Sequence, residues 1–526
     1  MTEGPRPSQW WMMPNANASF ARWIPIVTAG LLVSTAGGAL VTACSSKETT
    51  PSADAGGTDA STRTDGEPMD AGAGDAAPAT GDAGPPPPLA GTVTIALDGG
   101  SAISSFAFGH NYWDWVNWAG DGITGVTGTE ADISALDLNV LRAGGNNNDL
   151  NGPAPSVFDT SQIDAFVAYC RAVGAEPILQ VPILGDVDGG PATAQTAADM
   201  VTYANVTKGY AIKYWEIGNE PDLYPRSYDA GVPLTPADLC TVYQNDEAAM
   251  KAANAAAPDG GVPMAFLGPE LSYQYIPSAD YLTPFLDACK DFVDIVAVHR
   301  YPFGGGTEQG VPATSIHGAL ADVTTFRSAV ASLKSIVAGH ARPATPLAIT
   351  EANISFDYQA TAYTAAALPA APTTFYAGLW TADILGASLE TGLWTTAFWN
   401  IGDPSTAPSM LGFLQSGQPV PAYYTMQMIS SNFRGTTVVP AGVPAGFSVY
   451  ASYDAAAART NVLVLNKTAP VSSLAIAVDG MPVQSFAFPA LSATLIQMSS
   501  SPAGATHVLR YTQDQADAGV GPIAVQ

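Results

Sequence analysis

The sequence has few charged residues, and positive charge is the scarcest. Lys and Arg together number 19, against 46 Asp and Glu, and the formal net charge is −27. A chain this acidic is a poor partner for nucleic acid or for an anionic membrane surface, because both are polyanions. A neutral sugar polymer is compatible with it, so we expect a carbohydrate partner and no nucleic acid.

Histidine and cysteine are also rare. The five His are scattered, and no Cys or His cluster has the spacing of metal ligands. The four Cys are Cys44, Cys170, Cys240 and Cys289. With Cys44 in a predicted lipidation signal, three remain, and at most one disulfide can form within the chain. A Cys240–Cys289 disulfide is one alternative, and buried free thiols are the interpretation that we favour.

The start of the chain has the pattern of an export signal. Residues 23–43 carry no charge, follow Arg22 and end in small residues directly before Cys44. This order is typical of a secretory signal. Small residues before a Cys resemble a bacterial lipobox, in which the Cys is lipidated, and by the sorting rules of such lipoproteins Ser45 favours the outer membrane. The alternative is an uncleaved anchor, because about 20 uncharged residues can just span a bilayer.

Residues 44–91 have the composition of a disordered linker. They are almost all Ala, Gly, Asp, Pro, Ser and Thr, and they end in Pro85 to Pro88. A segment with so few large apolar side chains cannot bury enough surface to offset its ordering entropy. We therefore expect a lipoprotein signal peptide over 1–43 and a tether over 44–91. The membrane is contacted only through the lipid anchor, and the location is the bacterial cell envelope or the secreted fraction.

From residue 92 short β-rich runs alternate with longer, Ala-rich runs. Near-continuous apolar strands alternating with helices are typical of a parallel sheet that is buried on both faces. Eight units fit a closed (β/α)8 TIM barrel over 92–435. A doubly wound open sheet is the alternative, although the first turn lacks a GxGxxG fingerprint. Strands are expected at 105–113, 139–145, 176–183, 214–221, 264–271, 294–302, 346–354 and 393–401, and helices near 128–136, 159–174, 193–207, 235–256, 278–290, 315–338, 373–390 and 420–433.

The pattern changes again after residue 435, where helical runs stop. Short β-rich runs separated by turn residues over 436–500 predict a small antiparallel β-sandwich. The opening run 92–98 is expected to join this sandwich. The tail 501–526 has one candidate strand, HVLRYT.

Two of the predicted strands end in a carboxyl group. Glu220 closes the run YWEIGNEP and precedes Pro221, which stops the strand, and Glu351 lies at the exit of LAITEAN. Barrel enzymes place catalysis at the C-terminal ends of their strands, and the fourth and seventh strands face one another across the mouth. Glycoside hydrolysis needs two carboxyl groups, one protonated and one ionised. A separation of roughly 5–5.5 Å would give retention of configuration.

These motifs resemble a known group of enzymes. WEIGNEPDLY and AITEAN are similar to clan A of the glycoside hydrolases, retaining barrel enzymes with an Asn-Glu pair ending strand four and a Glu ending strand seven. EIGNEPDLY and LRAGGNNND look closest to family 79, the glucuronidases and heparanases, and are somewhat similar to families 39, 44 and 51. The resemblance covers about residues 92–500. The further sugar-acid contacts usual in family 79 are not found in this sequence.

The resemblance implies a role for three residues in the reaction itself. Glu220 resembles the acid/base and Glu351 the nucleophile. Asn219 resembles the residue that hydrogen-bonds the sugar 2-hydroxyl, a contact that helps the transition state more than the ground state.

Four further residues match positions around the bound sugar. Arg142 matches an Arg that supports the nucleophile, since a nearby cation keeps a carboxylate ionised. His299 and Tyr301 match imidazole or aromatic positions beside the nucleophile, and Trp399 matches a floor for the sugar. Three of them have a structural alternative: an ion-pair partner for Arg142, and a place in the core for His299 and Trp399.

Other polar residues compete for these roles. Glu216 lies on the strand of Glu220 but about 13 Å deeper, so we interpret it as a buried, paired barrel residue. Glu270 also ends a strand and is an alternative to Glu351. Residues that could line the mouth, without an assigned role, are His110, Asn111, Trp113, Asn146 and Asp149.

The sequence therefore predicts a retaining O-glycosidase for a β-linked polysaccharide or oligosaccharide. No metal or organic cofactor is expected, because two carboxyl groups suffice. One alternative is a surface carbohydrate-binding lipoprotein that has lost catalysis, and another is a barrel enzyme with metal-assisted chemistry. The sugar, its linkage and the oligomeric state are left open.

Overall fold

The structure is a computed structural model. The predicted signal peptide, the lipidation site Cys44 and nearly all of the predicted linker lie outside the residues that it describes. Within the described part of the chain, no helix is long and apolar enough to cross a bilayer. The described residues are 87–89, 91–113, 126, 128–149, 158–185, 191–223, 234–272, 279–304, 307–308, 316–356, 371–403 and 410–526.

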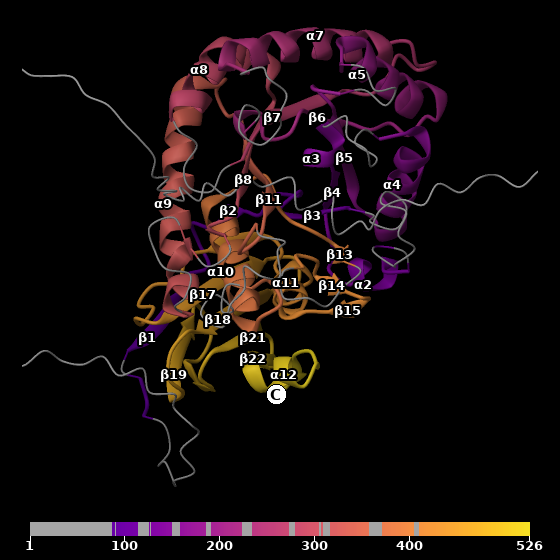
Figure 1. The fold of residues 1–526 in the computed structure, drawn as a ribbon. Coiled ribbons are helices and arrows are strands. Elements are labelled where there is room, and N and C mark those ends of the chain that lie inside the picture. Colours follow the sequence, from indigo (N-terminus) through magenta and orange to yellow (C-terminus); the bar gives the residue numbers. More distant parts are fainter. Residues whose placement is uncertain are drawn as a thin grey trace, which may run out of the picture. The chain divides into compact units, whose positions relative to one another are not determined.

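Eight parallel strands close into a barrel (Figure 1). Each lies inside one of the predicted runs, and the strands follow one another around the ring in chain order. This confirms the predicted TIM barrel and excludes the doubly wound open sheet. The strands are β3 (Phe108–Asn111), β4 (Val140–Ala143), β5 (Glu176–Val181), β6 (Tyr214–Ile217), β7 (Ala265–Leu271), β8 (Ile295–Arg300), β11 (Leu347–Ala352) and β12 (Thr396–Phe398).

The barrel interior changes from apolar to polar along the strands. A buried aliphatic cluster, made of Val140, Ile178, Leu267, Ile295, Ala297 and Ala348, fills one layer. Two residues further along a strand the side chain points the same way. There the positions become polar and stay buried: Arg142, Gln180, His299 and Thr350.

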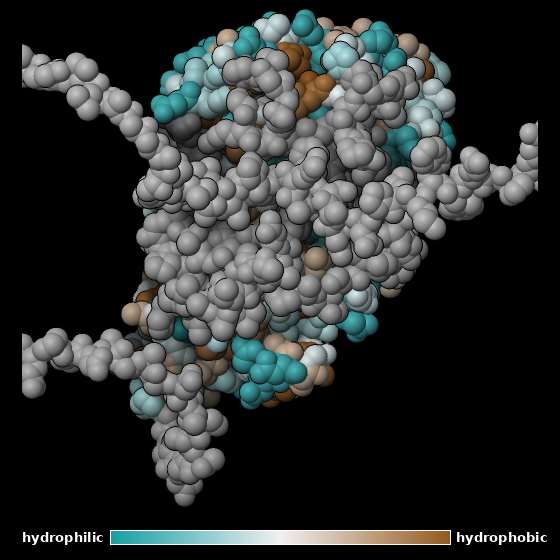
Figure 2. All heavy atoms as spheres, in the orientation of Figure 1, coloured by the Kyte–Doolittle hydropathy of each residue, from teal (hydrophilic) through white to brown (hydrophobic). Residues whose placement is uncertain are grey.

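Helices surround the barrel where the sequence predicts them. Their ends follow from local chemistry: α7 starts at a capping box between Thr235 and Asp238, and α4 ends at the left-handed Gly174. Figure 2 shows mainly hydrophilic side chains where α7 and α8 face solvent. The helices are α2 (Glu130–Ser134), α3 (Asn146–Asp149), α4 (Thr160–Val173), α5 (Ala194–Val201) continued by the π-helix η3 (Thr202–Thr207), η4 (Pro221–Leu223), α7 (Pro236–Asn254), α8 (Ala279–Cys289), η5 (Lys290–Phe292), α9 (Ile316–His340), α10 (Phe375–Thr391) and α11 (Pro421–Ser430).

The three cysteines in the described chain are buried free thiols. They are Cys170, Cys240 and Cys289. The Cys289 thiol points at the backbone oxygen of Cys240, at 3.8 Å.

A β-sandwich follows the barrel, as predicted. Its seven-stranded sheet has the order β2-β16-β17-β18-β21-β22-β23, and its second sheet has the order β1-β19-β20. β1 pairs with β19 in parallel, an exception to the antiparallel pairing expected throughout. The strands are β1 (Thr92–Ile95), β2 (Ser101–Ala102), β16 (Thr436–Val438), β17 (Phe447–Asp454), β18 (Arg459–Asn466), β19 (Val471–Val478), β20 (Gln484–Phe488), β21 (Ser492–Ser500), β22 (Ala503–Thr512) and β23 (Ile523–Ala524), with α12 (Gln513–Asp517) before β23.

Helix α10 joins the barrel to the sandwich. It is apolar on all sides and lies beside α9, α11 and β17 (Figure 1). The Tyr450 hydroxyl of β17 donates to Asp383 of α10 at 2.5 Å, and Lys467 forms an ion pair with the same carboxylate. A Cβ on Gly386 would lie 2.4 Å from the Tyr450 ring, so this close approach needs glycine.

Short strands also form outside the barrel and the sandwich. The segment after β12 contains a small three-stranded sheet. In it, Gly402–Asp403 pairs with Leu414–Gln415 in parallel. These strands are β9 (Phe303–Gly304), β10 (Thr307–Glu308), β13 (Gly402–Asp403), β14 (Leu414–Gln415) and β15 (Gln418–Pro419).

Candidate active site

Two buried carboxyl groups meet at the C-terminal ends of β6 and β11. Glu220 is 8% exposed and Glu351 is 5% exposed. One carboxylate oxygen of each lies within 4.8 Å of the other and of a ring nitrogen of His299. Retaining glycosidases hold their carboxyl groups roughly 5–5.5 Å apart, and inverting ones roughly 6.5–9.5 Å apart. The nearest oxygens of the two groups are close enough for both carboxyl groups to reach one glycosidic bond.

The backbone turns sharply to present Glu220. Gly218 has φ 78° and Glu220 has φ 47°, a conformation that is costly for a residue with a side chain. The Glu220 N–H donates to the backbone oxygen of Glu270 at 2.8 Å, which holds the turn. A Cβ on Gly218 would lie 2.5 Å from Cδ1 of Ile183, so glycine is required by both space and torsion.

Arg142 is fully buried beneath the two carboxyl groups. Its Nη1 donates to Glu351 Oε1 at 2.6 Å and to Asn111 Oδ1 at 3.0 Å. Its Nη2 donates to Asn219 Oδ1 at 2.8 Å, and its Nε to Glu216 Oε2 at 2.6 Å. Glu216 is therefore the buried, paired residue that the sequence predicted. Asn111, to which the sequence assigned no role, holds the guanidinium in place.

His299 bridges three carboxyl groups. Its Nδ1 lies 2.9 Å from Glu220 and 3.6 Å from Glu351, and its Nε2 lies 3.2 Å from Glu270. Burial lowers the pKa of His299, but the charge on Glu351 and the hydrogen bonds to Glu220 and Glu270 outweigh it and raise the pKa to about 10. At neutral pH the ring is therefore an imidazolium.

The surroundings move the two carboxyl pKa values in opposite directions. Burial raises the pKa of Glu220, and its hydrogen bond to His299 opposes this only in part. Burial acts the same way on Glu351, but the charges of His299 and Arg142 and a 2.8 Å hydrogen bond from the Tyr301 hydroxyl lower its pKa. One group thus tends to hold a proton while the other stays ionised, which is the division that acid/base chemistry requires.

Trp399 and Asn219 border the same site. Trp399 is buried at the end of β12, and a Cβ on Gly145, which has φ 112°, would lie 2.9 Å from its ring. Asn219 donates from Nδ2 to Asn146 at 2.5 Å, and its N–H donates to Asp149 Oδ2 at 2.7 Å. A ring wall and an oriented amide therefore lie beside the carboxyl pair.

The structure brings every predicted catalytic and substrate-binding residue to this mouth. Their roles stay predictions. Of the unassigned candidates, His110 is fully buried and burial lowers its pKa to about 3, so it is a neutral barrel residue. Glu270 lies beside His299 instead of taking the place of Glu351. The residues brought together are Arg142, Asn219, Glu220, His299, Tyr301, Glu351 and Trp399.

The carboxyl pair and His299 also have the spacing of metal ligands. Both ring nitrogens of His299 already face carboxyl groups, Nδ1 at 2.9 Å from Glu220 and Nε2 at 3.2 Å from Glu270. Arg142 already occupies one oxygen of Glu351. Arg142 and His299 thus already pair with the carboxyl groups that a metal ion would need as ligands.

Comparison with known proteins identifies the fold. No family model and no curated protein matches the sequence. Among solved structures, CelM2, a bifunctional glucanase-xylanase from a metagenome library, superposes with a TM-score of 0.55 at 17% identity over 80% of this chain and 95% of that one. The family 44 endoglucanase Cel44A of Clostridium thermocellum gives 0.56 at 15% identity over 77% and 99%.

A second family is represented as well. The family 51 α-L-arabinofuranosidase of Thermotoga petrophila gives a TM-score of 0.56 at 14% identity, over 78% of this chain and 100% of that one. At such identities the likeness establishes a shared fold. Families 44 and 51 are two of those that the motifs resemble, and the closer likeness to family 79 stays a prediction.

Proposed function

We propose that the protein is a retaining glycoside hydrolase that cleaves O-glycosidic bonds of a β-linked polysaccharide or oligosaccharide. The observation that supports this is the carboxyl pair itself. Glu220 and Glu351 approach within 4.8 Å at the barrel mouth, and their pKa values are shifted in opposite directions.

The reaction proceeds by two displacements at the anomeric carbon. In the first, Glu220 donates its proton to the glycosidic oxygen while the Glu351 carboxylate attacks, so that the aglycone leaves and a glycosyl ester forms. In the second, the Glu220 carboxylate takes a proton from water, the water oxygen attacks the anomeric carbon, and Glu351 is released. Both groups return to their starting protonation states.

The neighbours of the pair support each step. The His299 imidazolium, 2.9 Å from Glu220, stabilises the carboxylate that remains after proton donation. Arg142 and Tyr301 keep Glu351 ionised and aimed before attack. In this proposal the Asn219 amide binds the sugar 2-hydroxyl, and Trp399 packs against the sugar ring.

The substrate class rests on these likenesses and on charge. The similar structures are named as a glucanase-xylanase, an endoglucanase and an α-L-arabinofuranosidase. A neutral glycan also suits a chain with a net charge of −27. Within the same proposal, a lipid on Cys44 holds the enzyme at the bacterial surface, and a Cys44→Ala variant should appear in the medium instead of the membrane fraction.

The first test is a hydrolysis screen with the full chain. The panel holds aryl β-glycosides and plant, fungal and bacterial polysaccharides, and Glu351→Ala is run beside the parent. Turnover by the parent that Glu351→Ala abolishes, with its circular dichroism unchanged, supports the proposal. Sugar binding without turnover in the parent would instead identify a carbohydrate-binding lipoprotein. Turnover lost on addition of a chelator would identify a metal-assisted enzyme.

A second variant separates the two carboxyl roles. Glu220→Ala should reduce turnover of substrates with poor leaving groups far more than that of activated aryl glycosides, because only the former need a proton on the leaving oxygen. Comparing kcat/KM across a series of aryl β-glycosides of graded leaving-group pKa measures this. Equal losses across the series would remove Glu220 as the general acid.

A further inference from the structure

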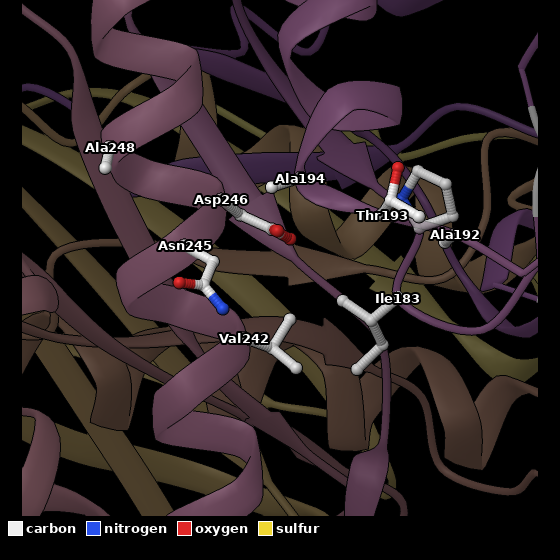
Figure 3. A pocket seen from close by; sticks show the side chains of 9 residues that line it. Ile183, Ala192, Thr193, Ala194, Val242, Asn245, Asp246 and Ala248 are labelled. Atoms are coloured by element: carbon white, nitrogen blue, oxygen red, sulfur yellow. The ribbon is translucent and has the colours of Figure 1, made fainter.

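A cavity lies between α5 and α7, and none of the catalytic residues named above lines it. It has a volume of about 480 Å³. Figure 3 shows side chains of both helices and of the segment after β5 around it. The lining consists of Pro182, Ile183, Ala192, Thr193, Ala194, Val242, Asn245, Asp246 and Ala248.

Asp246 gives this cavity its chemistry. It is 4% exposed, and its carboxylate points into the space between Ala194, Val242 and Ile183 (Figure 3). Across the residues that the structure describes, no hydrogen bond or ion pair satisfies it. Its oxygens are not fully enclosed, so they open onto the cavity, where a ligand can reach a carboxyl group that is otherwise surrounded by protein.

The electrostatics around Asp246 are of one sign. Among the described residues that line the cavity, Asp246 is the ionisable side chain, and the others are small, aliphatic or neutral polar. Burial raises the pKa of Asp246 to about 7, and the negative charge of Asp149 adds to the shift. The charged group that acts on Asp246 is Asp149, on α3. A positively charged ligand would favour the ionised form of Asp246, which burial and the charge of Asp149 both disfavour.

We infer that this cavity is a binding site for a small organic ligand with an ammonium group on a compact aliphatic or sugar-sized body. The ammonium pairs with Asp246, and the Asn245 amide in the lining offers a further hydrogen bond. The body packs against Ile183, Val242 and the alanines. This inference does not depend on the proposed glycosidase activity.

The cavity lies one layer of residues behind the catalytic acid. Ile183 forms part of its wall, and the same side chain packs against Gly218 in the turn that presents Glu220. The Ile183 N–H donates to Asp149 Oδ1, and the Asn219 N–H donates to Asp149 Oδ2, each at 2.7 Å. Ile183 therefore lies between the two sites, and no catalytic residue lines the cavity.

A matched pair of probes tests the inference by calorimetry with the full chain. Cyclohexylammonium and cyclohexanol have the same ring, and only the first carries a charge between pH 5 and 9. We expect cyclohexylammonium to bind, and cyclohexanol to bind about tenfold or more weakly, because a charge-assisted hydrogen bond is lost. Cyclohexylammonium affinity should rise between pH 5 and 8 as Asp246 ionises.

Variants locate the binding. Asp246→Asn should abolish the preference for cyclohexylammonium, and Val242→Phe, which fills the cavity, should weaken both probes. Asp199→Asn removes an exposed carboxylate from α5 and controls for net charge, and Glu351→Ala controls for binding at the catalytic pair. Both controls should retain affinity.

Three outcomes would overturn the inference. They are no binding of cyclohexylammonium, equal binding of cyclohexanol, and cyclohexylammonium binding that survives in Asp246→Asn. If Asp246→Asn fails to fold, Val242→Phe becomes the deciding variant, and unchanged cyclohexylammonium affinity in that variant overturns the inference. D-glucose binding at the affinity of cyclohexylammonium that Val242→Phe abolishes would also contradict it and would indicate a neutral sugar site in the cavity.

Discussion

At the scale of single residues, the opposite pKa shifts of Glu220 and Glu351 predict a bell-shaped pH profile. Glu351 must be ionised, so its lowered pKa sets the acidic limb of kcat/KM, and activity falls below that pKa. Glu220 must be protonated, so its raised pKa sets the alkaline limb. In Glu220→Gln, with an aryl glycoside that needs no general acid, the alkaline limb should disappear while the acidic limb stays. A surviving alkaline limb would assign it to another group.

Glu270 is a positioning residue at the same scale. Its carboxylate accepts a hydrogen bond from Nε2, which helps to raise the pKa of His299. Glu270→Gln keeps the shape but removes the charge, so the pKa of His299 should fall by about 1–2 units, together with kcat/KM. Titration of labelled histidine by NMR measures the shift. Glu247→Gln, a buried carboxylate on α7 paired with Lys251, is the control that should leave His299 unchanged.

At the scale of elements, the turn after β6 determines where Glu220 points. Gly218→Ala should cost roughly 1–2 kcal/mol of stability through its positive φ and should also push against Ile183. A displacement of about 1 Å can reduce turnover about 100-fold, so we expect a loss of that order in kcat/KM. Gly209→Ala is a matched control, because Gly209 has φ 63° and no neighbour within 4 Å of its added Cβ. It should lose stability without losing kcat/KM.

At the scale of the whole molecule, the barrel and the sandwich are joined through buried polar contacts on α10. Tyr450→Phe removes the donor to Asp383 and leaves that carboxylate with fewer partners. The free energy of unfolding should fall by about 1–3 kcal/mol, while kcat/KM per folded molecule stays the same. Urea unfolding of Tyr450→Phe beside Tyr453→Phe, a half-buried tyrosine on the same strand, measures this. Equal stability of the two variants would show that the contact contributes nothing.

Much of this organisation could be predicted from pattern because it is local. The eight strands of the barrel coincide with apolar runs. In the run that contains β6, Pro221 marked Glu220 as the residue at the strand end, and the deeper Glu216 was correctly interpreted as a buried, paired residue. Other elements escaped because their signal is weak. β13 to β15 are two residues long, and the five-residue β20 is only partly buried. Short strands of this kind are defined by partners that are distant in sequence.

The sequence by itself determined the alternation of strand and helix and the two strand ends that carry Glu220 and Glu351, because these depend on burial periodicity and on which residues stop a strand. Only the tertiary structure decided that Glu270 pairs with His299 and that Asp246 faces a cavity. It also decided that the pKa of Glu220 is raised and that of Glu351 is lowered. Desolvation and charge act through space, and the groups that supply them here come from strands far apart along the chain.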